Sequence, residues 1–170
     1  MGLFDFFKKK EPEVVLEPID VDDEAIVALA DGQLIDVTTV PDPVFAEKMM
    51  GETIAFKFDG DKVVLCAPAN GTLTVLFPTG HAFGVTANNG VEILVHCGID
   101  TVNANGDGFR LMKKRQGDQV KAGDPIVEAD LKKLSANYDM STMLIVTNPN
   151  GREINFIEPG AVKRGESVIK

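Results

Sequence analysis

The two histidines of this 170-residue chain are the side chains best suited to chemistry. His81 lies in the segment LFPTGHAFGV and His96 in GVEILVHCGIDTV, so apolar residues and turn-forming glycines flank both. Burial among apolar side chains disfavours the charged imidazolium, and a neutral imidazole is both a nucleophile and a metal ligand. The sequence therefore predicts that His81 and His96 carry the function.

Two strands joined by a tight turn would bring these histidines together. The segment NNG at 88–90 separates an apolar run after His81 from another before His96, and such turns connect antiparallel strands. A shift of one residue in the pairing would turn either side chain to the other face of the sheet. Contact between the two imidazoles is therefore a hypothesis at this point.

Other catalytic patterns fit the chain poorly. It contains no GxSxG, HExxH, GxxxxGK[ST] or GxGxxG motif, which argues against hydrolase and nucleotide-binding functions. His81 and His96 with Asp100 nearby would make an incomplete zinc site, because a structural site takes four protein ligands and a catalytic site normally three. A zinc-dependent hydrolase is thus a weaker alternative. Reversible phosphorylation of a histidine needs neither a metal nor a nucleotide on this chain.

Composition places these residues in one main folded unit. Lys and Arg number 17 against 26 Asp and Glu, which gives a net charge of −9. This charge argues against nucleic acid as a partner and favours solubility or attraction to a basic protein surface. Cys66 and Cys97 lie in apolar runs without the spacing of a disulfide framework, so we expect a reducing, cytoplasmic location.

The beginning of the chain differs from the rest. Residues 1–10, MGLFDFFKKK, join aromatic side chains to lysines, but their apolar stretch is far shorter than the roughly 20 residues of a spanning helix. Two interpretations are open: a weak amphipathic anchor on an anionic membrane surface, or a frayed terminus. Residues 11–24 hold prolines and many acidic side chains, as is typical of a linker. We therefore expect a flexible tail over 1–24 and a domain over 25–170.

From residue 25 onward the pattern is that of an all-β domain. Short runs rich in Val, Ile, Phe and Thr alternate with turn signals such as DG, NG, TG and NNG. Hairpins share a core only by stacking as two sheets or by closing into a barrel, and we expect an antiparallel β-sandwich built from hairpins. One or two short accessory helices are predicted at 42–50, with Asp42 as cap, and near 130–137, with Asp130 as cap.

Three motifs, in this order along the chain, make it similar to a known family. VPDPVFAEKMMG at 40–51, PTGHAF at 78–83 and GVEILVHCGIDTV at 90–102 resemble the glucose-type IIA component of the bacterial phosphoenolpyruvate-dependent sugar phosphotransferase system, in its free-standing form. The resemblance runs from about residue 25 to the end. It implies a β-sandwich phosphotransferase that accepts a phosphoryl group from the histidine-containing phosphocarrier protein. During sugar uptake this group passes to a cysteine of a sugar-specific IIB domain.

The resemblance also implies the roles of individual residues. His96 matches the phosphorylated histidine, with phosphate on Nε2, His81 matches the supporting histidine, and Thr79 matches the hydroxyl that orients His81. No cofactor is obligatory, although Zn²⁺ shared between the two histidines and a partner protein is implied for some complexes. A partner-binding surface is implied at Asp42, Val44, Phe45, Phe77, Leu94, Val95 and Asp100.

A purely regulatory interaction module is the second function left open. In that case the unphosphorylated apolar face binds other metabolic proteins, and the negative charge added at His96 disrupts those contacts. Carrier and regulator are compatible with each other. Both fit a cytoplasmic protein that contacts the inner face of the membrane peripherally through its tail.

Overall fold

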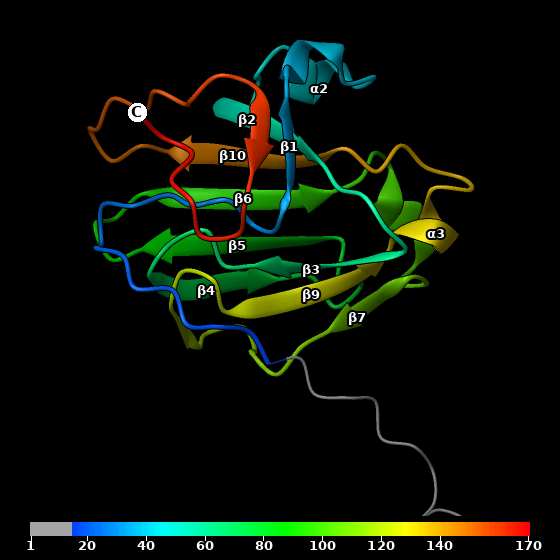
Figure 1. Cartoon of the computed structure of the whole chain (residues 1–170), viewed down its shortest axis with the longest axis horizontal. Helices are drawn as coiled ribbons and strands as arrows, with labels where there is room; N and C mark the ends of the chain where they lie inside the picture. The colour runs from blue at the N-terminus through cyan, green and yellow to red at the C-terminus, as the bar shows by residue number, and fades with distance from the viewer. Residues whose placement is uncertain (1–14) are drawn as a thin grey trace, which may run out of the picture.

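Residues 15–170 are described by the computed structural model, and antiparallel strands form most of their regular structure (Figure 1). The strands are β1 (Gly32–Ile35), β2 (Glu52–Lys57), β3 (Lys62–Cys66), β4 (Gly71–Leu76), β5 (Ala82–Ala87), β6 (Glu92–Cys97), β7 (Phe109–Leu111), β8 (Gln119–Val120), β9 (Pro125–Asp130), β10 (Thr142–Asn148) and β11 (Gly160–Val162). Eight of them form one sheet in the order β11-β1-β2-β10-β6-β5-β4-β8, and a smaller sheet has the order β3-β9-β7.

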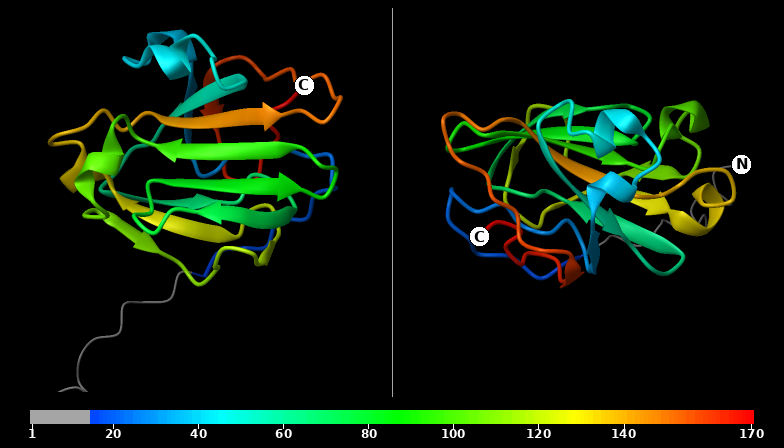
Figure 2. Two further views of the ribbon diagram at one scale, coloured as in Figure 1. Left: turned by 180° about the vertical axis from the view of Figure 1, so that it is seen from behind. Right: turned by 90° about the horizontal axis from the view of Figure 1, so that it is seen from above.

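The two sheets lie face to face around one main core. In Figure 1, β3 and β9 lie in front of the larger sheet, and Figure 2 shows β10, β6 and β5 nearest the viewer when the molecule is seen from behind. Leu65 of β3 and Val127 of β9 share the core with Phe83 and Val85 of β5. The predicted antiparallel β-sandwich is confirmed.

Strand β6 determines which side chains reach the outer face of the larger sheet. Ile93, Val95 and Cys97 are buried in the main core, whereas Leu94 and His96 are only partly buried. Successive side chains of a strand point to opposite faces of its sheet. His96 therefore lies on the outer face, away from the smaller sheet.

The segment before β2 covers part of this outer face. It contains a 3₁₀ helix, η1 (Val37–Thr39), and a short α-helix, α2 (Pro43–Ala46), which stands at one end of the molecule in Figure 1. Beneath it lies a second apolar cluster that also includes residues of β2 and β10. Its buried members are Val37, Val40, Phe45, Ala55, Ile99, Met143 and Ile145.

Both predicted helices exist, but they are shorter than expected. The carboxylate of Asp42 accepts a hydrogen bond from the backbone N–H of Val44 at 2.9 Å and so caps α2. The helix ends at Ala46, and Lys48 has a φ of 54°, outside the helical region. The second helix, α3 (Leu131–Leu134), is capped by Asp130. Two 3₁₀ helices, η1 and η2 (Thr101–Ala104), were not predicted, because three or four residues show no helical periodicity.

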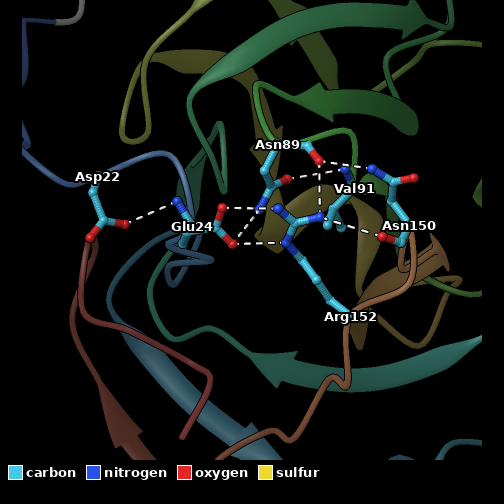
Figure 3. Close-up of polar contacts among 6 residues, drawn as sticks. All are labelled: Asp22, Glu24, Asn89, Val91, Asn150 and Arg152. Carbon is cyan, nitrogen blue, oxygen red and sulfur yellow. Dashed lines mark hydrogen bonds and ion pairs between the residues drawn. The ribbon is translucent and has the colours of Figure 1, made fainter.

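The end of the predicted acidic linker lies against the domain. The guanidinium of Arg152 donates to both carboxylate oxygens of Glu24, at 2.8 and 3.0 Å, and the Asn89 side-chain amide donates to the same carboxylate at 3.1 Å (Figure 3). Arg152 also donates to the backbone oxygens of Asn89 and Asn150, at 3.1 and 3.4 Å. These contacts join Glu24 to two loops of the sandwich.

The division of the chain at residue 24 stays a prediction. Residues 1–10, for which a membrane anchor and a frayed terminus were both left open, lie outside the described residues. Within residues 15–170, no helix is long and apolar enough to cross a membrane.

Candidate functional site

A hairpin brings the two histidines together. Strands β5 and β6 pair antiparallel with Ala82 opposite His96, and the backbone N–H of Cys97 donates to the carbonyl of His81 at 2.7 Å. The predicted turn at 88–90 connects the two strands, and its Gly90 has a φ of 88°, a conformation that glycine adopts at little cost. The hypothesis that neighbouring strands carry the imidazoles to one place is therefore confirmed.

The two rings lie next to each other between two phenylalanines. Their centroids are 5.4 Å apart, and the ring planes are inclined by 77°. Phe45 packs against His96 at 5.1 Å between centroids, and Phe77 meets His81 edge-on at 5.0 Å. His81 is 3% exposed, whereas His96 is half-buried. Of the pair, His96 is the ring more open to a visiting molecule.

The contact of His96 with Gly98 fixes which ring nitrogen is reactive. Nδ1 of His96 lies 2.8 Å from the carbonyl oxygen of Gly98. A carbonyl oxygen only accepts hydrogen bonds, so Nδ1 carries the hydrogen and donates it. In the neutral ring Nε2 then keeps its lone pair. The geometry thus leaves Nε2 as the ring nitrogen with a free lone pair, and Nε2 is the atom that the resemblance predicts to carry the phosphate.

Thr79 orients the second imidazole. Its hydroxyl lies 2.7 Å from Nδ1 of His81. A hydroxyl both donates and accepts, so this contact fixes the direction of the ring and leaves either tautomer compatible with it. The residue is held in a turn, because the backbone N–H of Gly80 donates to the carbonyl of Phe77 at 2.8 Å and Gly80 has a φ of 78°. The expected pairing of Thr79 with His81 is present.

The surroundings keep both imidazoles neutral at neutral pH. Burial lowers the pKa of His81, and repulsion from His96 lowers it further. Burial also lowers the pKa of His96, although the Gly98 carbonyl and the carboxylates of Asp42 and Asp100 oppose this effect. Because a neutral imidazole keeps a lone pair, these histidines are suited to act as nucleophiles and not as proton donors in the charged form.

Part of the predicted partner-binding surface lies around the pair. Val44 is 40% exposed and Phe77 is 41% exposed, and Leu94 is partly buried beside His96 on the outer face. Asp42 is partly buried at the start of α2, and Asp100 is exposed just after β6. These five residues are available to a partner.

Two residues of the predicted surface need correction. Val95 is 1% exposed, because alternation along β6 turns its side chain into the main core. Phe45 is 7% exposed and belongs to the second apolar cluster beneath α2, where its ring also touches that of His96. Val95 therefore cannot contact a partner in this structure, and Phe45 supports His96 more than it meets solvent.

The sequence reasoning missed Val75, an exposed residue of the same face. In register, Val75 of β4 lies opposite Gly84 of β5, which lies opposite Leu94 of β6. A β-bulge between Leu73 and Val75 breaks the alternation of the strand, so that Leu73 is buried and Val75 is exposed. Strict alternation would have placed both side chains on one face. Val102, exposed in η2, was missed as well.

Neither cysteine of the chain is accessible for reaction. Cys66 and Cys97 are unpaired and buried, and burial raises the pKa of each thiol to about 12. Within residues 15–170, no group of three or more His, Cys, Asp and Glu side chains could hold a metal ion. The zinc-dependent hydrolase therefore has no ligand set in the described part of the chain.

Comparisons with known proteins agree with this fold. A family model, described as phosphoenolpyruvate-dependent sugar phosphotransferase system, EIIA 1, matches residues 24–151. The glucose-specific EIIA component of the phosphotransferase system of Staphylococcus aureus (strain COL) is 38% identical over an alignment of 149 residues, and the match covers 86% of this chain and 88% of that protein. The solved structure of glucose permease IIA from Mycoplasma capricolum has a TM-score of 0.79 and 37% identity, and the match covers 85% of this chain and 93% of that one.

Longer relatives contain the same unit. The glucose-specific EIICBA component of Staphylococcus carnosus (strain TM300) is 40% identical over 139 residues, which are 81% of this chain. The matched region is 20% of that protein, so this chain spans about a fifth of its length.

The chain belongs to the EIIA 1 family of the phosphoenolpyruvate-dependent sugar phosphotransferase system. Its role in that system is that of a phosphotransferase component. The family needs no cofactor for this role.

Proposed function

We propose that His96 accepts the phosphoryl group on Nε2 from the histidine-containing phosphocarrier protein and donates it to a cysteine of a sugar-specific IIB domain. The hydrogen bond from His96 Nδ1 to the Gly98 carbonyl is the observation that carries this proposal. It leaves the Nε2 lone pair on a partly exposed ring next to a second imidazole.

In the acceptance step, the Nε2 lone pair of His96 attacks the phosphorus of the donor's phosphohistidine. A new N–P bond forms, the N–P bond to the donor imidazole breaks, and the donor nitrogen takes back its electron pair. The attack gives the His96 ring positive charge, and the Gly98 carbonyl at 2.8 Å stabilises that charge through Nδ1–H. The step exchanges one N–P bond for another, so it is neither a redox reaction nor a hydrolysis.

His81 stabilises the group while it is transferred. Its ring lies beside that of His96, and in the tautomer whose Nδ1 accepts from the Thr79 hydroxyl, Nε2–H is free to donate to a phosphoryl oxygen. Catalysis of such a transfer consists mainly of alignment and charge stabilisation. A donor held in place before the partner arrives costs no reorganisation during the reaction.

Labelling tests this proposal. The protein is incubated with radiolabelled phosphoenolpyruvate and the upstream phosphocarrier proteins, and the expected result is one acid-labile phosphoryl group per chain. His96→Ala should take no label, whereas His81→Gln should still be labelled at His96. Label that persists in folded His96→Ala would refute the proposal.

The exposed apolar side chains around the pair suit reversible docking of these partners. Val44, Phe77 and Leu94 would exclude water from the transfer, as the apolar centre of a protein interface does. Asp42 and Asp100 lie at the rim, where charges change association rates more than affinities. We expect basic groups on the partner opposite them.

Regulatory binding is proposed as an additional function of the same surface. Phosphorylation of His96 would add negative charge beside Asp42 and Asp100, whose carboxylates already act on this ring. Pull-downs with phosphorylated and unphosphorylated protein should therefore give different partner sets, and identical sets would contradict the proposal. A zinc ion shared by His81, His96 and a partner's carboxylate stays a prediction for such complexes. So does contact of residues 1–10 with anionic membrane.

A further inference from the structure

The segment that follows β6 carries the carbonyl that holds His96. After the strand ends, Gly98 has a φ of 81° and Asp100 a φ of 59°, so the chain turns sharply through two left-handed residues. The backbone N–H of Gly98 donates to the carbonyl of Ser141 at 3.0 Å, and that of Ile99 donates to the carbonyl of Asp139 at 2.8 Å. The turn is therefore anchored to the loop that precedes β10.

Thr101 adds a further contact inside this turn. Its side chain is completely buried, at 0% exposure, and its hydroxyl donates to the carbonyl oxygen of Cys97 at 2.5 Å. That carbonyl and the N–H of Gly98 belong to one peptide unit. Ser141 holds the unit at its N–H end and Thr101 at its carbonyl end.

This peptide unit affects the orientation of the Gly98 carbonyl, because it precedes the flexible backbone of that glycine. Glycine has the widest backbone freedom of all residues, so fixed neighbours are what determine its conformation. The Gly98 carbonyl must point at Nδ1 of His96 to keep the hydrogen there, at the observed 2.8 Å. Rotation about the N–Cα bond of Gly98, which connects this peptide unit to that carbonyl, would move the carbonyl away from the ring.

We propose that Thr101 is a positioning residue for phosphoryl transfer. Its hydroxyl fixes the peptide unit between Cys97 and Gly98, and this keeps the Gly98 carbonyl on Nδ1 of His96. The reactive Nε2 thereby retains its lone pair and its direction. The proposal rests on the proposed role of His96 as phosphoryl acceptor, since Thr101 itself touches neither the phosphoryl group nor an imidazole.

Two substitutions separate the hydroxyl from the bulk of the side chain. Thr101→Val keeps the shape and removes the donor, whereas Thr101→Ser keeps the donor and removes a methyl group. Thr53→Val is the matched control, because Thr53 is also buried and donates to a backbone carbonyl, that of Gly51, at 2.8 Å. It lies on β2, which β10 separates from β6 in the larger sheet.

The first measurement is the ¹⁵N chemical shifts of the His96 ring nitrogens in the unphosphorylated protein. Native protein, Thr101→Ser and Thr53→Val should all show Nδ1–H and an unprotonated Nε2. Thr101→Val should show a mixture of the two tautomers. Unchanged His96 shifts in folded Thr101→Val would overturn the proposal. This readout does not depend on phosphorylation, so it separates failure of this proposal from failure of the carrier function.

The second measurement is the rate of phosphoryl acceptance from the phosphocarrier protein. Thr101→Val should be slowed about tenfold or more, since small displacements of reacting groups cost that much, and Thr101→Ser and Thr53→Val should stay near the native rate. Equal slowing of Thr101→Val and Thr53→Val would show a general loss of stability and refute positioning. If Thr101→Val does not fold, Thr101→Ala, which also lacks a side-chain donor, takes its place. Native tautomer and rate in folded Thr101→Ala would overturn the proposal, and a mixture of tautomers would support it.

Discussion

The backbone N–H of Cys97 donates a hydrogen bond to the carbonyl oxygen of His81 at 2.7 Å. The main chain next to His96 is therefore hydrogen-bonded to the main chain of His81. The distance between the two imidazoles is therefore set by main-chain pairing of a hairpin, in addition to side-chain packing. Such pairing leaves less freedom than two side chains on separate loops would have. Substitution of either imidazole should consequently change the rate of phosphoryl transfer and leave the pairing of β5 with β6 intact.

His81→Gln should slow phosphoryl transfer by about a hundredfold, because it removes an imidazole N–H aimed at the transferring group. The fold should be retained, since glutamine is of similar length and is uncharged like the neutral imidazole. Rapid-quench measurement of transfer from the phosphocarrier protein checks the rate. A native rate in the folded variant would exclude a stabilising role for His81.

Thr79→Val should slow the same step by about tenfold, because the hydroxyl at 2.7 Å from His81 Nδ1 is lost and the ring is no longer held in one direction. Thr79→Ser, which retains the hydroxyl, is the control and should transfer at nearly the native rate. His96 should take label in both variants. Equal rates for the valine and serine variants would show that Thr79 only forms its turn.

The free energy of unfolding should fall as the pH drops below about 6.5. Both histidines have folded-state pKa values below their ordinary value of 6.5, first of all because of burial. Below pH 6.5 the unfolded chain then binds more protons than the folded one, so acidification favours unfolding until the folded pKa values are passed. Urea unfolding near pH 7.5 and near pH 5.5 measures the difference. The double variant His81→Gln/His96→Gln should lose part of this pH dependence, and an unchanged dependence would contradict the assignment.

Substitutions of Val95 and Val44, both predicted for the partner-binding surface, should affect different properties of the protein. Val95→Ala should lower the free energy of unfolding by about 2 kcal/mol, because it opens a cavity in the main core. Val44→Ser should change that free energy by less than about 0.5 kcal/mol, since the residue is exposed. It should instead raise the concentration of phosphocarrier protein needed for half-maximal transfer. Chemical denaturation and transfer kinetics on both variants test this contrast.

The sequence predicted the class of fold and the histidine hairpin because both rest on local patterns. Turn signals at 88–90 and the apolar runs on either side are enough to define β5 and β6. The caps at Asp42 and Asp130 are equally local, since each carboxylate bonds to a backbone N–H two or three residues later. Such features need no knowledge of the rest of the chain.

The faces of individual strands were harder to predict. Val95 was placed on the partner surface by resemblance, although its neighbour His96 on the same strand already required it to face inward. Val75 was missed because a β-bulge, which no periodicity reveals, turns it outward. The contact between Glu24 and Arg152 could not be predicted from local patterns either, since 128 residues separate the two in sequence.

Strand β6 presents its reactive imidazole on one side and three core side chains, Ile93, Val95 and Cys97, on the other. Substitutions of these core residues, made to raise the thermal stability of the protein, would therefore also shift the strand that positions His96. Stabilising substitutions should therefore leave β6 unchanged and be made on other elements of the core.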